Sequence, residues 1–169
     1  VIQLTVQQHV RTVVKTTKQQ LQHQLVEKFA VYDKLLFEIE EKIDDHIEGN
    51  LPRMADFLMH QENSLDALGQ DLLEQAAKTY GFEEIYLINS EGIIFNTTFE
   101  KDLNFNLFSI SRAFRKSMED LMGSGNVLVD RIGFSSKTGK INKYAYYSPP
   151  GSDIIVEISI GMKKASSRI

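Results

Sequence analysis

The feature that most constrains the fold of this chain is a long stretch without a helix breaker near its start. Residues 5–48 include neither proline nor glycine, the two residue types that most disfavour a helix. Through and beyond this stretch, apolar or small side chains recur with a mean spacing of about 3.7 residues, which predicts one long helix with a single apolar stripe. The stripe consists of Val6, Val10, Val13, Thr17, Leu21, Leu25, Phe29, Tyr32, Leu36, Ile39, Ile43, Ile47, Leu51 and Met54.

This stripe is too long to be covered by one small domain. We therefore expect part of it to meet the same stripe of a second copy, which makes the chain a homodimer through its N-terminal helix. The spacing of about 3.7 favours a nearly straight or slightly right-handed helix pair, because a left-handed coiled coil needs about 3.5. The alternative is a single amphipathic helix that lies along its own domain.

Two further helices are predicted after the long one. Gly49-Asn50-Leu51-Pro52 is expected to break or kink the first helix, since Pro52 lacks an amide donor and restricts Leu51, and a shorter helix then runs from Pro52 to about His60. Asn63 or Ser64 is a typical N-cap for another helix over residues 65–79, which Gly81 ends. The inward-facing residues of that helix are expected to be Leu68, Leu72, Leu73 and Ala76.

A hairpin is predicted over residues 83–98. Two runs rich in β-branched and aromatic residues, 85–88 and 93–98, flank Asn89-Ser90-Glu91-Gly92, and Gly92 can take a positive φ at no steric cost. Apolar residues fall on both faces of the first run, so this strand should lie inside a sheet that is covered on both sides.

The sequence that follows the hairpin predicts one helix and three strands. Ser109 or Ser111 starts a helix that ends before Gly123, and strands follow at residues 126–134, 143–147 and 153–161. The turns between these strands, at residues 135–140 and 148–152, are too short for parallel crossovers. The predicted class is therefore α+β, with a long N-terminal helix and a five-stranded antiparallel sheet that has helices on both faces.

Composition excludes several functions. The net charge is −4 and the basic residues are scattered, so nucleic-acid binding is not expected. The absence of cysteine removes disulfides and thiolate sites. No apolar run approaches the roughly 18 residues that span a bilayer. We expect the chain to be a soluble segment whose flanking membrane spans lie outside the sequence.

The order of elements, the motif Ile-Tyr-Leu-Ile-Asn-Ser-Glu-Gly-Ile-Ile-Phe-Asn-Thr-Thr and the closing strand of residues 154–161 resemble the Cache family of extracytoplasmic PAS-like sensor domains. The resemblance covers residues 35–162 and matches the single-module form. It implies a dimerising helix over residues 1–62 with a kink near Pro52, a PAS-like Cache core over 63–162, and a linker over 163–169 toward a membrane span.

Membership of this family implies the extracytoplasmic (periplasmic) ligand-sensing domain of an inner-membrane receptor. The receptor would be of the histidine kinase, chemoreceptor or diguanylate cyclase type, and ligand binding would be passed on through a helix pair. Any enzymatic activity would belong to an output domain outside this sequence. The alternatives are a ligand-free module for dimerisation or protein docking, and a cytoplasmic PAS domain.

Relatives of this kind hold small ligands between the sheet and the loop and helix that follow the hairpin. Carried onto this chain, the resemblance implies a site formed by Tyr86, Phe95, Asn96, Phe105, Phe108, Arg112, Arg115, Arg131, Tyr144 and Tyr146. Arginine offers the planar pair of donors that a carboxylate ligand needs, although each of the three can instead be a surface residue. The tyrosines can equally serve packing.

The amino-acid-binding signature of two-module relatives, an arginine followed closely by Trp-Tyr, is missing because the chain has no tryptophan. This argues against an amino-acid ligand. No cofactor or metal is expected, since the four histidines are too scattered for a helical zinc site, and no catalytic motif appears.

The last strand leaves two alternatives for Glu157, a buried charge or a residue on a solvent-exposed face of the sheet. Glu157 and Ser159 interrupt the apolar last strand on one face. If that face is covered, Glu157 must find a cation such as Lys143 on the neighbouring strand.

Overall fold

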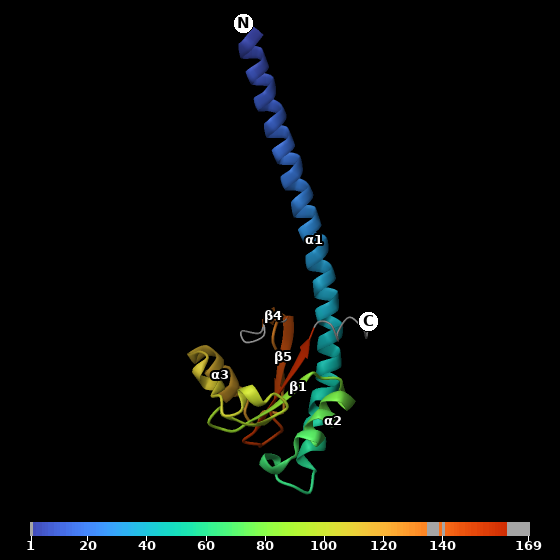
Figure 1. Ribbon diagram of the computed structural model, residues 1–169, viewed down its shortest axis with the longest axis vertical. Coiled ribbons are helices and arrows are strands. Elements are labelled where there is room, and N and C mark those ends of the chain that lie inside the picture. Colours follow the sequence, from blue (N-terminus) through green and yellow to red (C-terminus); the bar gives the residue numbers. More distant parts are fainter. Residues whose placement is uncertain (1, 135–138, 140, 162–169) are drawn as a thin grey trace. The chain divides into compact units, whose positions relative to one another are not determined.

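The computed structural model describes residues 2–134, 139 and 141–161, with side chains from Arg11 onward. The predicted linker of residues 163–169 and most of the turn at 135–140 lie outside the described residues. The chain forms two compact units, Val1–Glu41 and Lys42–Ile169. The second unit contains the sheet and the shorter helices (Figure 1).

The long helix is α1, Ile2–Met59. In the first unit its stripe is exposed to solvent: Leu21 is 55% exposed, Phe29 63% and Tyr32 65%. In the second unit the stripe is buried, since Ile47 and Leu51 are fully covered. The apolar stripe therefore changes from an exposed surface to part of the core along one helix, and a partner for its exposed part stays a prediction.

The expectation of a separate helix starting at Pro52 is wrong. Pro52 lies inside α1, which continues to Met59. A proline removes one helical hydrogen bond, but Leu51, Met54 and Ala55 around it are completely buried, and such packing is the main source of helix stability in proteins. A kink at Pro52 stays a prediction.

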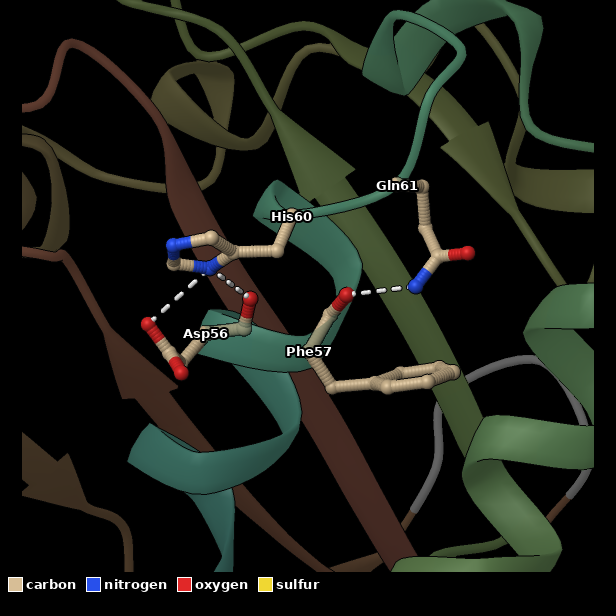
Figure 2. A network of polar contacts seen from close by, with 4 residues as sticks. All are labelled: Asp56, Phe57, His60 and Gln61. Carbon is tan, nitrogen blue, oxygen red and sulfur yellow. Dashed lines mark hydrogen bonds and ion pairs between the residues drawn. The ribbon is translucent and has the colours of Figure 1, made fainter.

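Exposed side chains complete the hydrogen bonding at the C-terminal end of α1. The His60 ring nitrogen Nδ1 lies 2.8 Å from the carbonyl oxygen of Asp56, and Gln61 Nε2 donates to the carbonyl oxygen of Phe57 at 2.8 Å (Figure 2). The Gln61 side chain thus supplies a donor to the Phe57 carbonyl at the helix end, whereas the Asp56 carbonyl also accepts from the backbone amide of His60 at 3.1 Å.

The predicted helix of residues 65–79 is divided in two. A 3₁₀ turn, η1 (Leu65–Ala67), follows Ser64, and α2 (Gln70–Tyr80) begins after Gly69. The stop at Gly81 is confirmed, because its φ is 86° and its amide donates to the carbonyl of Ala77. Leu68, Leu73 and Ala76 are buried as expected, whereas Leu72 is only half-buried.

The hairpin is confirmed as β1 (Glu84–Ile88) and β2 (Ile94–Thr97) in antiparallel pairing. Asn89 Oδ1 accepts hydrogen bonds from the amides of Glu91 and Ile93, both at 3.0 Å, and Gly92 has a φ of 81°. All β1 residues after Glu84 are buried, as expected for a strand covered on both faces.

The sheet order is β2-β1-β6-β5-β3. The predicted strand of residues 126–134 is interrupted into β3 (Val127–Val129) and β4 (Gly133–Phe134), which pair with successive parts of β5 (Ile141–Tyr147). The central strand is β6 (Ile155–Gly161), whose residues are all buried.

Helices cover both faces of this antiparallel sheet, as predicted. One face carries α3 (Arg112–Leu121), and the other carries α2 and the part of α1 that belongs to the second unit (Figure 1). Ser111 is the N-cap of α3, its side chain accepting a hydrogen bond from the amide of Phe114. Two short 3₁₀ turns, η2 (Glu100–Asp102) and η3 (Leu107–Ser109), lie between β2 and α3.

Candidate functional site

The strand register defines the sheet face that packs against α3, here called the α3 face. On β6 it contains Ile155, Glu157 and Ser159, because side chains two residues apart share a face. Tyr86 and Tyr146 lie opposite Glu157 on the two neighbouring strands. In the same way, Glu84 and Tyr144 lie opposite Ser159. The three central strands thus place polar side chains in two adjacent rows.

One half of the α3 face is apolar and filled. Its core side chains are all at least nine-tenths buried: Ile88, Ile94, Leu107, Met118, Leu121 and Ile155. The Phe114 ring meets the Tyr146 ring edge-on, with 5.6 Å between centroids. This half therefore anchors α3 and η3 on the sheet.

The other half is a network of polar groups. Glu84 Oε2 accepts hydrogen bonds from the Tyr86 hydroxyl at 2.7 Å and from Ser159 Oγ at 2.8 Å. The Tyr146 hydroxyl faces Glu157 and Asp130, and its interaction with each lowers the pKa of that carboxyl. Carboxyl groups therefore approach the central strand from both sides.

Glu157 is the most perturbed group of this network. Burial raises the pKa of its carboxyl to about 8; the hydrogen bond from Tyr146 opposes the rise, and the negative charges of Asp102, Asp130 and Glu84 add to it. Burial also raises the pKa of Tyr146, as does the charge of Glu157. Near neutral pH, Glu157 is therefore mostly protonated.

Two buried acceptors on the α3 face lack hydrogen-bond partners among the described residues. One is Oε2 of Glu157, whose residue is 5% exposed, and the other is Oδ1 of Asn142, whose residue is 4% exposed. Asn142 lies on the same face as Tyr144 and donates from Nδ2 to its hydroxyl at 3.4 Å. Buried polar atoms are nearly always paired, so these two oxygens mark places where the polar half of the face is incompletely satisfied.

The segment after β2 is fixed along the sheet edge. The amide of Asn104 donates to the carbonyl of Ile94, and the amide of Ile94 to that of Phe105. The Phe108 ring packs directly on Gly92, where a side chain would overlap it. Since Gly92 also has a positive φ, the turn and the segment constrain each other.

The structure brings only part of the predicted site together. Tyr86, Tyr144 and Tyr146 share the α3 face, and the half-buried Phe108 packs at its apolar end. Phe105 is 39% exposed, and Phe95 is the extra residue of a bulge in β2.

Asn96 lies on the opposite face, where its Nδ2 donates to the carbonyls of Leu65 and Leu68 at 2.9 and 3.0 Å. It therefore holds η1 against the sheet. The side chain is occupied by structural hydrogen bonds and does not join the tyrosines.

The three candidate arginines differ from the tyrosines in their exposure. Arg112, Arg115 and Arg131 are exposed, and Arg115 is paired with Glu119 at 2.7 Å. Arg115 also lines an open surface hollow of about 400 Å³ with Phe108 and Ser90, among others. The donors expected for a carboxylate ligand thus lie at the surface.

The expected pair of Glu157 with Lys143 is wrong. The face of Glu157 is covered, but Lys143 points to the other face, since it lies one residue from Tyr144 on β5. Its Nζ lies 2.6 Å from Asp44 Oδ1 of α1. Sequence reasoning also missed Glu84, Asp102, Asp130 and Asn142. Strand alternation alone could have placed Glu84 and Asn142 on the same face as Glu157, opposite Ser159 and Gly161.

The carboxyl groups are too dispersed for a metal ion. Within the part of the chain that the structure describes, no group of three or more histidine, cysteine, aspartate or glutamate residues could hold one. None of the described helices combines the length and apolar character that a membrane crossing needs.

The antiparallel sheet has the order β2-β1-β6-β5-β3, with β4 also paired to β5, and helices cover both of its faces. Together with the long helix that precedes it, this fold matches that of extracellular sensor domains of the Cache type. No family model matches the sequence, and no curated protein matches it. The fold is therefore identified through solved structures.

Three of these structures are informative. The Bacillus subtilis YkuI protein, which has an EAL domain and was solved with c-di-GMP and calcium, matches with a TM-score of 0.57 and 14% identity over 83% of this chain and 37% of its own. A second match is the ligand-binding domain of the Campylobacter jejuni chemoreceptor Tlp3 in complex with 4-methylisoleucine. It has a TM-score of 0.54 and 6% sequence identity, and the match covers 79% of this chain and 57% of the Tlp3 chain.

A third match is the ligand-binding domain of the Pseudomonas aeruginosa chemoreceptor PctC in complex with GABA. It has a TM-score of 0.50 and 10% sequence identity, and the match covers 80% of this chain and 62% of the PctC chain. The chain thus spans less than two thirds of each of these structures. At such identities the likeness establishes the fold, and the activity follows only from the residues of this chain.

Proposed function

We propose that this chain is the extracytoplasmic ligand-sensing domain of a transmembrane signal-transduction receptor. The observation that carries the proposal is the Cache-type fold whose α3 face is apolar and filled in one half and polar in the other, where Glu157 and Asn142 each keep a buried oxygen without a hydrogen-bond partner among the described residues. The solved neighbours Tlp3 and PctC hold small molecules, which supports the same role here. Histidine kinases, chemoreceptors and diguanylate cyclases are the receptor types we expect, with membrane spans flanking this segment.

The ligand would bind over the polar half of the α3 face, in contact with Tyr86, Tyr144 and Tyr146. A shift of β5 on binding would reach α1, because Lys143 on its other face lies against Asp44. Ligand binding would thus favour one packing of the sheet against the helix, a population shift between two states.

The exposed stripe of the first unit would pair with a second copy and pass this shift on. Within this stripe, Leu21, Leu25, Phe29, Tyr32 and Leu36 fall within one arc of the helix, and each is at least 38% exposed. A continuous row of large apolar side chains in water is unfavourable, and an identical helix offers a matching row.

A thermal-shift screen of small carboxylates, amines and sugars tests ligand sensing. A ligand that binds the folded state must raise its melting temperature. If no compound stabilises the chain, the proposed sensing function fails. The rival is then a ligand-free docking or dimerisation module, which the filled apolar half under Leu107 and Met118 favours.

Sedimentation equilibrium tests the helix pair. Phe29→Asp should weaken self-association at least tenfold, whereas Val31→Asp, which is as exposed but off the stripe, should not. Equal behaviour of the two variants would contradict pairing through this stripe. In the full receptor, a disulfide-locked helix pair that still signals in response to ligand would contradict transmission through the pair.

A further inference from the structure

We propose that a surface hollow lined by Arg112, Arg115 and Lys116 of α3 binds a phosphate group, either free phosphate or the phosphate of a small monoester. These three side chains are exposed, so the site is separate from the buried tyrosines of the α3 face. The inference therefore goes beyond the proposed sensing function and does not depend on it.

The hollow has two parts that share Phe108, Ser109 and Arg115. The smaller part, of about 400 Å³, lies against the hairpin turn at Ser90, and the larger part, of about 690 Å³, runs along α3. Small-molecule sites in proteins have volumes of about 300–1,000 Å³. The larger part thus has room for a phosphate monoester.

The larger part of the hollow carries a net positive charge. Three cations, Arg112, Arg115 and Lys116, line it against two acids, Glu119 and Asp120. Glu119 is already paired with Arg115. This part of the hollow therefore attracts an anion and repels an organic cation.

Arg112 and Lys116 are the two cations without partners. Neither forms a hydrogen bond or an ion pair in the part of the chain that the structure describes, although Asp120 lies one turn beyond Lys116. The two cations are four residues apart on α3, and like charges at this spacing destabilise a helix. A dianion bound between them replaces this repulsion with charge-assisted hydrogen bonds.

Arg115 is held in place before any ligand binds. Its Nε lies 2.7 Å from Glu119 Oε1, and its guanidinium carbon lies 5.6 Å from the centroid of the Phe108 ring. Phe108 is itself fixed, because its ring packs directly on Gly92. A guanidinium that is already ordered loses less side-chain entropy when it takes up a ligand.

The donors around the hollow suit a phosphate better than a carboxylate. Ser111 Oγ accepts a hydrogen bond from the amide of Phe114, which leaves its own proton for a ligand. Together with the cations, it offers donors on several separate side chains of the lining. A phosphate has three acceptor oxygens that point in different directions, whereas a carboxylate has two oxygens in one plane.

The experiment is a calorimetric titration at pH 7.5 with inorganic phosphate, phenyl phosphate, acetate and 1-butylamine as probes. We expect the two phosphates to bind, and their affinity to fall several-fold as the salt concentration rises from about 50 to about 300 mM. Acetate and 1-butylamine should bind at least about tenfold more weakly. Tighter binding of phenyl phosphate than of phosphate identifies a monoester as the ligand, and the reverse order identifies free phosphate.

A double substitution tests the two unpaired cations. Arg112→Gln with Lys116→Gln should weaken phosphate binding about tenfold or more, and without ligand it should be no less stable than the wild type, since it removes a repulsion. The matched control is Arg11→Gln with Lys15→Gln, which removes the same two charges at the same spacing from exposed positions of α1. It should leave the affinity for phosphate unchanged.

Three results overturn the phosphate site. They are no binding of either phosphate, binding of acetate as tight as that of phosphate, and phosphate binding that is unchanged in the double variant of α3. Each of these leaves ligand sensing intact, because the ligands in its thermal-shift screen are expected at the tyrosines. Conversely, a failed screen overturns sensing and leaves the phosphate site standing.

Discussion

Glu157→Gln should remove a large pH dependence from the stability of this domain. Glutamine keeps the size of the side chain and resembles the protonated carboxyl, so the variant mimics the form that the folded protein favours. Glu157 is fully buried, with a pKa of about 8 against 4.5 for an ordinary glutamate.

The direction in which the free energy of unfolding changes with pH follows from the protonation of Glu157 in the folded and unfolded chains. Below pH 4.5 both the folded and the unfolded chain hold the proton. As the pH rises toward 8 the unfolded chain loses its proton while the folded chain keeps it, so the free energy of unfolding falls. Above about pH 8 both are ionised and the loss is complete.

The expected loss of stability is large for a single side chain. The difference between a pKa of about 8 and 4.5, at about 1.36 kcal/mol per unit, corresponds to roughly 5 kcal/mol. A typical domain has a total stability of only about 5–15 kcal/mol. The wild type should therefore lose several kcal/mol relative to Glu157→Gln between pH 5 and 8.

Urea unfolding of the two proteins at half-unit pH intervals measures this difference. Other titrating groups affect both proteins alike, so the quantity of interest is the gap between the two curves, and Glu119→Gln serves as an exposed control. A gap that stays constant within about 0.5 kcal/mol from pH 5 to 8 would refute the buried, desolvated state of Glu157.

Three further substitutions test the fold around the site by urea unfolding at pH 7. Gly92→Ala should cost about 2 kcal/mol or more, because the residue has a φ of 81° and a Cβ would overlap the Phe108 ring; a cost below 0.5 kcal/mol would contradict this packing. Asp44→Asn should cost about 2 kcal/mol, since it removes a charge that faces the buried Lys143 at 2.6 Å, and no loss would show that Lys143 does not depend on this pair. Ser111→Ala should cost about 1 kcal/mol through the lost N-cap of α3, and an unchanged midpoint would argue against that cap.

Much of the fold could be predicted from local sequence patterns. The Asn89–Gly92 turn, the stop at Gly81 and the cap at Ser111 each depend on one residue whose backbone preference or side-chain oxygen determines the local structure. The two-faced burial of β1 followed from apolar residues at consecutive positions. The predictions for these elements agree with the structure because local sequence preference and tertiary packing favour the same conformation.

The errors arose where tertiary packing outweighs local preference. Pro52 signals a helix end, yet the helix continues because the residues around it are fully buried in the core. The placement of the arginines in a ligand site stays a prediction, because it rests on the family resemblance and on residue type, and neither reveals which way an exposed side chain points. Glu157 was paired with Lys143 although strand alternation puts the two on opposite faces.

Glu157 sits where a bound group can influence the whole domain. It lies on the central strand between Tyr86 of β1 and Tyr146 of β5, so a group bound at Glu157 would act on both neighbouring strands. On its opposite face β5 carries Lys143 to Asp44 of α1. A protein that needed only stability would fill this position with an apolar residue, because a buried carboxyl without a full set of partners costs free energy. The position that violates the packing rule thus lies beside the strand that contacts the helix, which is the arrangement that the proposed sensor requires.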